Sequence, residues 1–321
     1  KLGVEKNVVL YDKVSFAGIV AFYKGCDVFL CMSEHEGFCI PVIEAEYCGL
    51  PVVAYYRRGV PEALGPTQPW FTSLNYIDYA RKLHEIRSSP DLANELGKAA
   101  ADSVRQRFPI KAIRSRFLKW MSGITRALEN NPESGGMRHR IAFVVQRYGQ
   151  DVSGCAEAFA RMYAEKLAEF YDVDVITTTS KTLDWDSTLQ ICDVSDDANP
   201  QVLRFHPESP RDWLKFASAC EASSNGRMSF ADWLLVAGPK SPQMADFLQV
   251  NAQSYALIIN WTYLYSNALY VANLAGRVPL LCVPFFHDEP WLYISGHNEV
   301  ARCFDGFVYQ TDAEKALAEK V

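Results

Sequence analysis

The sequence predicts an α/β protein with mostly parallel sheets, divided into two domains. Short apolar runs alternate with helical patterns along the chain, which is typical of βα units. A run of polar residues, proline and glycine at residues 129–136 interrupts this alternation and indicates a domain linker. The 321 residues, of which 49% are hydrophobic and 22% charged, supply enough apolar material for two ordinary domains.

The segment before the polar run contains few strand candidates. We expect strands at residues 8–10, 28–31 and 51–54. We expect helices at residues 16–24, 41–48 and 92–107, followed by a helical tail at 110–128. Three strands are few for a doubly wound sheet, so residues 1–132 are expected to be a partial domain whose opening strands lie upstream of Lys1.

After a linker at residues 133–137, the pattern restarts and predicts a nearly complete Rossmann-like domain over residues 138–321. It opens with a buried strand at 141–145, a glycine-containing loop and an amphipathic helix at 155–168. Further strands are expected at residues 173–176, 233–236, 256–259 and 280–283. Residues 316–321 are typical of a helix that continues, and together with the first residue, Lys1, they predict an internal piece of a longer polypeptide.

Composition argues against several classes of function. The net charge of -6 and the pI near 5.6 disfavour a nucleic-acid surface, which needs clustered Lys and Arg. No apolar run approaches the roughly 18 residues of a membrane span, and no signal peptide is recognisable. Nine cysteines without a Cys-x-x-Cys pair are typical of reduced buried thiols. We therefore expect a cytoplasmic protein, either soluble or peripheral to the inner face of the membrane.

The first candidate site lies at residues 33–44, which follow a predicted strand and open a predicted helix. Ligands of open α/β sheets bind beyond the carboxyl ends of the strands, where a helix N-terminus offers amides to a pyrophosphate. Glu44 in the early helix could accept hydrogen bonds from the vicinal hydroxyls of a ribose, and Glu36 in the loop could reach a sugar hydroxyl. Taken alone, the two glutamates are more typical of ordinary charges at a helix N-terminus than of a binding site.

The wider stretch resembles a known family. Glu36-Gly37-Phe38-Cys39-Ile40-Pro41 with Glu44-Ala45, followed by residues 49–54, is similar to the E-x7-E signature of the retaining glycosyltransferases of family 4, which have the GT-B fold. Residues 21–28 and 59–62 also match, and the resemblance covers roughly residues 8–117.

This resemblance implies a binding site for a UDP- or GDP-linked sugar donor, used as substrate, with no separate cofactor. Glu44 would hold the donor ribose and Glu36 the transferred hexose. The phosphates and the sugar would be lined by the backbone amides of Gly37, Phe38, Cys39 and Ile40. The family also contacts the diphosphate with an Arg and a Lys from strands earlier in the domain, which would lie upstream of Lys1.

Cys39 stands where the family usually has glycine, so a side chain is expected near the donor, while donation by the backbone amide survives. A reactive or metal-binding Cys39 is the alternative. The sequence disfavours it, because no second Cys or His is recognised at ligand spacing. Since an Asp-x-Asp motif is absent as well, no metal ligands are expected.

The second candidate site begins with the loop at residues 146–154, which follows the strand at 141–145. Gly149 and Gly154 allow close approach of a ligand, but they lack the G-x-G-x-x-G spacing of a dinucleotide site, which disfavours an NAD enzyme. The loop resembles the first loop of the amino-terminal domain in the same family, where a glycine pair meets the donor phosphate and the acceptor. Cys155 replaces one glycine that is common there.

His287 belongs to a segment, residues 283–291, that follows a buried strand and precedes a predicted helix. On local grounds the segment is equally compatible with a loop that has a capping Asp and a surface His. It resembles the family's strand-end His segment, and residues 305–312 resemble the strand that follows it. His287 would then face the leaving phosphate or a hydroxyl near the reacting carbon.

Together, the resemblances predict retaining transfer of a hexose from a nucleotide sugar to a glycan or lipid-linked acceptor, as in cell-surface polysaccharide biosynthesis. The acceptor would attack on the face from which the phosphate departs, and catalysis would depend on orientation and electrostatic stabilisation. Residues 1–132 would be the carboxyl-terminal donor domain of one transferase unit, and residues 138–321 the amino-terminal domain of a second. The alternatives are a sugar-nucleotide epimerase of the same architecture, a non-catalytic binding or scaffold module, and a single circularly permuted transferase.

Overall fold

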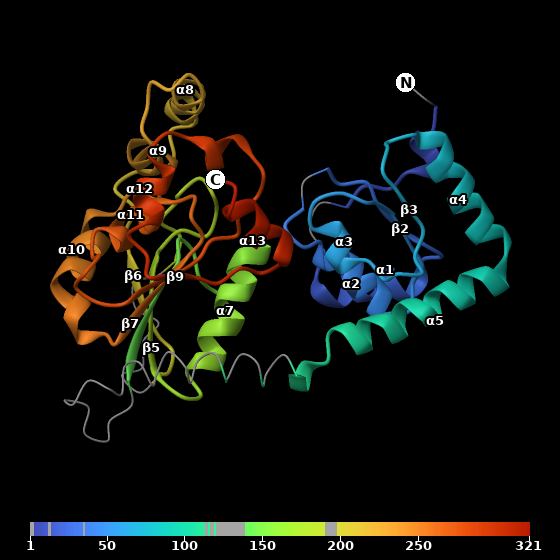
Figure 1. Ribbon diagram of the computed structural model, residues 1–321, viewed down its shortest axis with the longest axis horizontal. Coiled ribbons are helices and arrows are strands. Elements are labelled where there is room, and N and C mark those ends of the chain that lie inside the picture. The colour runs from blue at the N-terminus through green and yellow to red at the C-terminus, as the bar shows by residue number, and fades with distance from the viewer. Residues whose placement is uncertain are drawn as a thin grey trace. The chain divides into compact units, whose positions relative to one another are not determined.

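The chain divides into two compact units, Lys1–Ser122 and Gly123–Val321. The computed structural model describes residues 3–11, 14–34, 36–112, 115, 119, 139–189 and 198–321 (Figure 1). The predicted linker at residues 133–137 and almost all of the predicted helical tail beyond residue 112 lie outside the described residues.

The first unit contains a parallel sheet with the strand order β1(Phe29–Cys31)-β2(Val52–Tyr55)-β3(Trp70–Phe71). The central strand β2 pairs with both neighbours and is buried along its whole length, as expected for a parallel sheet covered on both faces. The strands predicted at residues 28–31 and 51–54 are therefore confirmed to within one residue.

The strand predicted at residues 8–10 is wrong. These residues form no strand, and their side chains are exposed, with 72% of Val9 and 90% of Leu10 accessible to solvent. An apolar run forms a strand only where a sheet edge pairs with its backbone, and none of the described strands pairs with this segment.

Among the described residues of this unit, five α-helices pack around the sheet (Figure 1), and side-chain caps define where three of them begin. Ser15, Asn75 and Ser89 each accept a hydrogen bond from a backbone amide in the first helical turn. The described helices of this unit are α1(Phe16–Gly25), α2(Ile40–Tyr47), α3(Val60–Ala63), α4(Tyr76–Ser88) and α5(Pro90–Arg107), with a short 3-10 helix at Glu5–Asn7. Helix α4 was not predicted from the sequence.

A buried ion pair fixes helix α2 against helices α3 and α5. The carboxylate of Glu46 accepts hydrogen bonds from the Gly65 amide at 2.6 Å and from Arg107 Nη2 at 2.9 Å. Arg107 also donates to the carbonyl oxygens of Glu62 and Ala63, which belong to α3. Burial raises the pKa of Glu46 to about 7, although the hydrogen bonds and the Arg107 charge act in the opposite direction.

The second unit contains a six-stranded parallel sheet with the order β6-β5-β4-β7-β8-β9. In order along the chain this is 3-2-1-4-5-6, the doubly wound arrangement in which the strand order reverses between β4 and β7. Ligands of such sheets bind beyond the carboxyl ends of the strands at that reversal. The strands are β4(Arg140–Val144), β5(Asp172–Thr178), β6(Gln201–Phe205), β7(Leu257–Trp261), β8(Leu280–Val283) and β9(Gly306–Phe307).

Helices cover both faces of this sheet. Figure 1 shows α7(Cys155–Leu167) on one side of the strands and α10(Pro242–Asn251) and α11(Ser266–Ala272) on the other. The remaining described helices are α8(Trp213–Ser224), α9(Phe230–Ala237), α12(His297–Ala301) and α13(Asp312–Ala318), with 3-10 turns at Ala252–Ser254 and Pro290–Tyr293. The helix expected at residues 316–321 corresponds to α13, which ends at Ala318.

The strand predicted at residues 233–236 is also wrong, because these residues belong to helix α9. Ser229 caps this helix, and its buried residues Phe230, Trp233, Leu234 and Ala237 follow the helical spacing i, i+3, i+4, i+7. A short apolar run cannot be assigned to a strand or to a buried helix by periodicity alone. The third strand of the doubly wound order is instead β6, whose sequence contains Gln and Arg and which was not predicted.

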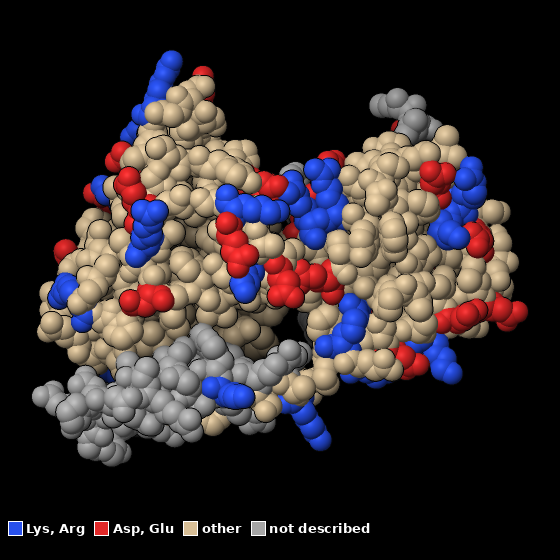
Figure 2. All heavy atoms as spheres, viewed as in Figure 1, with Lys and Arg blue, Asp and Glu red and all other residues tan. Residues whose placement is uncertain are grey.

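Charges of both signs are interspersed on the face of the molecule shown in Figure 2, where Lys and Arg stand beside Asp and Glu over each unit. Ion pairs within the two units include Lys82 with Glu85 and Lys240 with Glu208. None of the helices in the described ranges combines the length and the hydropathy that a membrane crossing requires.

Candidate functional site

The loop between β1 and α2 carries Glu36, Gly37, Phe38 and Cys39 of the predicted site and lies at the carboxyl end of β1, while Ile40 and Glu44 belong to α2. Gly59, in the loop after β2, fixes its conformation, since the Gly59 amide donates to the Glu36 carbonyl at 3.1 Å. A Cβ atom on Gly59 would lie 2.0 Å from the Gly37 carbonyl oxygen and 2.8 Å from the Phe38 nitrogen. Only glycine at position 59 therefore allows the two loops to pack in this way.

Cys39 ends this loop in the left-handed conformation, with φ 63° and ψ 63°, and precedes the first residue of α2, Ile40. The left-handed conformation costs a residue with a side chain about 1–2 kcal/mol, which explains physically why glycine is common at this position. Because α2 begins here, the amides of residues 37–40 lie at the positive end of the helix dipole, where a phosphate is favoured. The Phe38 ring packs edge-on against Phe108, with the centroids 5.8 Å apart.

Glu44 is half-buried on α2, and its carboxylate is held by helix α1. The Tyr23 hydroxyl donates a hydrogen bond to Glu44 Oε2 at 3.0 Å. Burial and the adjacent Glu44 charge raise the pKa of Tyr23 above its ordinary value, so Tyr23 remains a hydrogen-bond donor at neutral pH. Tyr23 lies in one of the segments that match the family, but the sequence did not indicate its contact with Glu44.

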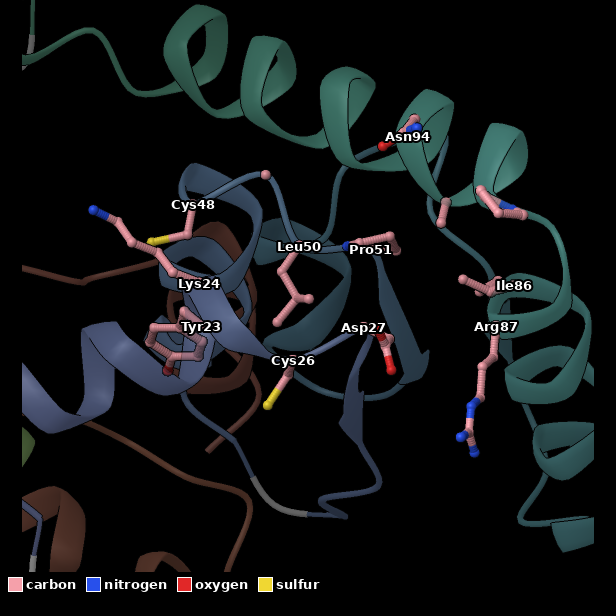
Figure 3. A pocket seen from close by; sticks show the side chains of 13 residues that line it. Tyr23, Lys24, Cys26, Asp27, Cys48, Leu50, Pro51, Ile86, Arg87 and Asn94 are labelled. Carbon is pink, nitrogen blue, oxygen red and sulfur yellow. The ribbon is translucent and has the colours of Figure 1, made fainter.

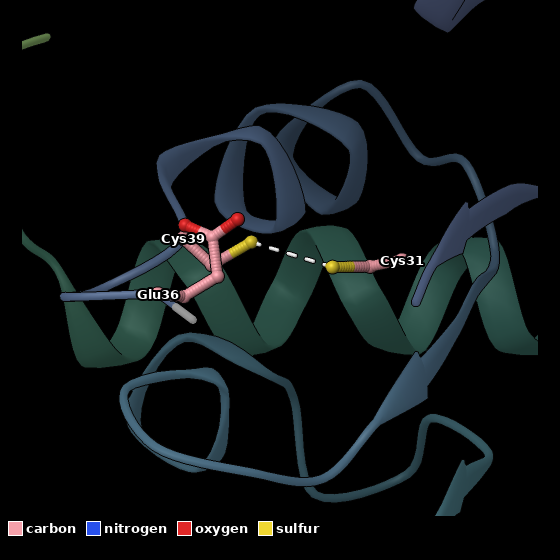
Figure 4. A group of neighbouring side chains, drawn as sticks. All are labelled: Cys31, Glu36 and Cys39. Atoms are coloured by element: carbon pink, nitrogen blue, oxygen red, sulfur yellow. Dashed lines mark hydrogen bonds between the residues drawn. The ribbon is translucent and has the colours of Figure 1, made fainter. Parts of the chain in front are cut away.

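The loop also contains a thiol pair that sequence spacing did not reveal. Cys31, the last residue of β1, places its Sγ atom 3.5 Å from the Sγ atom of Cys39, and both residues are buried (Figure 4). The sulfur atoms and a Glu36 carboxylate oxygen all lie within 4.8 Å of one another. Cys31 was interpreted from the sequence as one of the buried strand thiols, and the sequence spacing indicated no second Cys or His ligand for Cys39. The structure places Cys31 beside Cys39.

A hollow of about 380 Å³ in this unit lies at the opposite edge of the sheet (Figure 3). Its lining includes Cys26 and Asp27, just before β1, and residues 49–51, just before β2. None of the predicted site residues lines it. Since parallel α/β sheets bind ligands at the carboxyl ends of their strands, this hollow is separate from the candidate donor site.

In the second unit, the loop after β4 carries Gly149 and Gly154 and lies where the strand order reverses. Arg147 and Glu157 form a buried ion pair across this loop at 2.5 Å, and Gln146 Nε2 donates to the same Glu157 oxygen at 2.9 Å. Gly154 has φ 136°, and a Cβ atom there would lie 2.1 Å from Glu157 Oε2. Glycine suits position 154 because φ 136° is strained for a residue with a side chain and because a Cβ atom would displace the ion-paired Glu157 carboxylate, a constraint that the sequence did not reveal.

His287 is half-buried in the loop after β8, and buried Glu314 holds the backbone of this loop. The Glu314 carboxylate accepts hydrogen bonds from the amides of Phe286 at 2.7 Å and Gln310 at 2.6 Å. Burial raises the pKa of Glu314 to about 7, although backbone hydrogen bonds lower it. The segment after His287 forms the 3-10 turn Pro290–Tyr293, and helix α12 follows at His297–Ala301.

The end of β7 connects the loops that carry the glycines and His287. Thr262 Oγ1 donates to Gln146 Oε1 at 3.3 Å, which joins β7 to the glycine loop. The Trp261 ring lies 5.3 Å from the Phe285 ring, two residues before His287. Gly149, Gly154 and His287 are therefore on neighbouring loops at one edge of the second sheet, while Glu36 and Glu44 belong to the first unit.

Both units have parallel strands with polar loops at their carboxyl ends, which is the architecture of Rossmann-like ligand-binding proteins. The model of the family described as glycosyl transferases group 1 matches residues 1–103. This segment, which contains the Glu36 and Glu44 loop, is therefore a glycosyl transferase group 1 domain.

Several curated proteins are similar to the same segment. It is 32% identical over 103 residues to a D-inositol 3-phosphate glycosyltransferase of Streptomyces bingchenggensis. This match covers 32% of this chain and 23% of the relative. The same segment is 31% identical over 103 residues to an N,N'-diacetylbacillosaminyl-diphospho-undecaprenol alpha-1,3-N-acetylgalactosaminyltransferase of Campylobacter jejuni, which covers 32% of this chain and 27% of the relative. A trehalose synthase of Pyrococcus horikoshii is 28% identical over 104 residues, or 32% of this chain and 25% of the relative. The chain thus matches about a quarter of the length of these relatives.

Proposed function

We propose that the first unit is the donor-binding domain of a retaining glycosyltransferase. The observation that carries this proposal is the placement of Glu36 and Glu44 on either side of the α2 N-terminus, within a segment that matches the group 1 family. The nucleotide sugar binds with its diphosphate toward the amides of residues 37–40, its ribose on Glu44 and its hexose on Glu36.

The arrangement of Glu44 suits this role. Tyr23 engages Oε2 and so restricts the rotamers of the carboxylate before a ligand arrives. Preorganisation of this kind lowers the entropy lost when the ribose hydroxyls bind. Glu36 lies in a loop whose backbone is fixed by Gly59, so its carboxylate is presented from a rigid support.

For the second unit, we propose the amino-terminal domain of another transferase unit. The strand order 3-2-1-4-5-6 and the position of Gly149 and Gly154 at the reversal support a nucleotide-sugar or acceptor site there. His287, on a neighbouring loop, faces the leaving phosphate or a hydroxyl near the reacting carbon in this proposal. The polypeptide then has donor and acceptor domains of two units in tandem.

The proposed reaction transfers a hexose from a UDP- or GDP-linked donor to a glycan or lipid-linked acceptor, at the inner face of the membrane or in the cytoplasm. The name of the Campylobacter relative contains a diphospho-undecaprenol, which supports a lipid-linked acceptor. No cofactor takes part, and the barrier is lowered by orientation of the two substrates and by stabilisation of the developing diphosphate charge.

The experiment is a panel of UDP- and GDP-hexoses given to the intact polypeptide that contains this chain, with release of nucleoside diphosphate as the readout. We expect one donor to be consumed by the native protein and turnover to be lost in Glu36→Gln. Glu34→Gln is the matched control, because Glu34 is an exposed glutamate at the start of the same loop. Absence of donor binding or consumption across the panel would contradict the proposal.

A further inference from the structure

Three metal-ligating groups converge in the loop between β1 and α2. Cys31 lies at the end of the strand, Glu36 in the loop and Cys39 immediately before the helix. Figure 4 shows the two thiols pointing toward each other, with the Glu36 carboxylate beside Cys39. The three ligand atoms lie within 4.8 Å of one another, although the residues are five and three positions apart in the sequence.

The distances match those of a small thiolate site. In a tetrahedral zinc site with Zn–S bonds of about 2.3 Å, two sulfur ligands are separated by about 3.8 Å. The observed Sγ–Sγ distance of 3.5 Å needs a change of only a few tenths of an ångström. A disulfide would require the same atoms to approach to about 2.05 Å, a much larger displacement of two buried groups.

The two thiols share one hydrogen bond, which shifts their pKa values in opposite directions. The hydrogen bond with Cys39 lowers the pKa of Cys31, against the effect of burial, and a backbone hydrogen bond at Ser33 lowers it further. Cys39 has a raised pKa, first because it shares that hydrogen bond and then because it is buried. Coordination to a cation removes the proton from each thiol that it binds.

We propose that Cys31, Cys39 and Glu36 bind a thiophilic divalent cation such as Zn²⁺ through two sulfur atoms and one carboxylate oxygen. Two thiolates and a carboxylate favour zinc over the hard cations Mg²⁺ and Ca²⁺, which take oxygen ligands. Three protein ligands leave a fourth position open to water or to a ligand. Binding releases the thiol protons to solvent and involves no oxidation.

The site has a consequence that rests on the proposed function. Glu36 is the residue proposed to hold the transferred hexose, so a cation on Glu36 and a hexose on Glu36 exclude each other. Donor binding and metal binding are therefore expected to compete, so that a saturating concentration of either ligand raises the apparent Kd of the other.

Cobalt(II) titration of the reduced, metal-free protein tests the site. We expect sulfur-to-cobalt charge-transfer absorption that saturates at one equivalent and is bleached by Zn²⁺. Since even outer-shell partners contribute about 10–100-fold to metal affinity, Cys31→Ser and Cys39→Ser are each expected to weaken binding at least about tenfold and to reduce the charge-transfer intensity. Glu36→Gln is expected to weaken binding while it retains absorption from both sulfurs.

The controls are Cys26→Ser and Cys155→Ser, which remove exposed thiols elsewhere and are expected to leave the titration unchanged. Cys39→Gly is a second variant that lacks the Cys39 sulfur ligand. The glycine adopts the left-handed backbone of this position without strain. Far-UV circular dichroism checks that each variant is folded. Absence of the charge-transfer band, or an equal band in folded Cys31→Ser and Cys39→Gly, would overturn the proposal.

The titration contains no nucleotide sugar, so its result is independent of the proposed transfer. A thiolate–cobalt band without any donor binding would support the metal site and contradict the proposed function. Donor binding without the band would do the reverse. In the native protein, one equivalent of Zn²⁺ is expected to weaken donor binding, and this effect is expected to be lost in Cys39→Gly.

Discussion

Glu44 receives a hydrogen bond from Tyr23 before any ligand is present, which makes it the best positioned of the predicted donor residues. The spacing of Glu36 and Glu44 could be read from the sequence because both belong to one short motif. The sequence did not predict the contacts of Tyr23, Gly59 and Cys31, because each of these contacts joins residues of separate elements. A linear pattern identifies residue types at a spacing, whereas these contacts depend on how helix α1 and the loop after β2 pack against α2.

Removing the Glu44 carboxylate is expected to weaken donor binding by about 1.5–3 kcal/mol, the scale of a hydrogen bond to a charged group. Tyr23→Phe leaves the carboxylate but removes its support, so a smaller loss of about 0.5–1.5 kcal/mol is expected. Calorimetric titration of the donor measures both. If Glu44→Ala binds the donor as tightly as the exposed control Glu34→Ala, Glu44 does not hold the ribose.

Cys39 combines a strained backbone with a buried side chain, and two substitutions separate the two effects. Cys39→Ala and Cys39→Gly both remove the thiol, but only glycine adopts φ 63° without penalty. We expect Cys39→Gly to be more stable than Cys39→Ala by about 1 kcal/mol in denaturant unfolding. Cys39→Gly is also expected to retain transfer or to change the preferred sugar. Equal stability of the two variants would show that the left-handed backbone carries no strain.

At the scale of elements, the sequence predicted the strands and helices whose ends are marked by turn residues. Strands β4, β5, β7 and β8 and helix α7 were found close to their predicted positions, since buried parallel strands are short apolar runs bounded by turns. Helix α9 was mistaken for a strand because its apolar run is as short as that of a strand. Strand β6 was missed because its apolar side chains are only partly buried and because it contains Gln201 and the buried, charged Arg204. Burial by neighbouring elements decided both cases, and it is not a local property.

His297, at the start of α12, provides a test of how the second unit is packed. Its ring lies among Phe230, Tyr263 and Phe286 and is 7% exposed. Burial lowers the pKa of His297 to about 4, compared with about 6.5 in an unfolded chain. Between these values the unfolded state binds the proton more tightly, so the contribution of His297 to stability is complete above pH 6.5 and is lost as the pH falls toward 4.

We therefore expect the stability of the native protein, relative to His297→Gln, to fall by up to about 3 kcal/mol between pH 7 and pH 4. The comparison with the variant is necessary because Glu314, whose pKa is about 7, is expected to have the opposite effect in the same unit. The difference in unfolding free energy between the native protein and His297→Gln is measured by urea unfolding, followed by the fluorescence of the buried tryptophans Trp233 and Trp261. A pH-independent difference between the two proteins would contradict the burial of a neutral ring.

At the scale of the whole molecule, the order of the two units raises a question about which residues act together. In the GT-B arrangement that the sequence resembles, an amino-terminal domain precedes a carboxyl-terminal one, and the site lies between them. Here the unit with Glu36 and Glu44 precedes the unit with His287. A tandem polypeptide accounts for this order if each unit closes against a domain outside this chain, whereas a circular permutation would make both units parts of one site.

The two arrangements differ in how substitutions combine. In the tandem arrangement, residues of separate sites share no transition state, so Glu36→Ala is expected to abolish one glycosyl transfer of the intact polypeptide and leave the other. His287→Ala is expected to do the reverse. Each acceptor is supplied separately and the products are resolved by mass spectrometry, with Glu34→Ala as the control for the first unit. If Glu36→Ala and His287→Ala both remove the same single product, the residues serve one reaction, and the permuted arrangement replaces the tandem one.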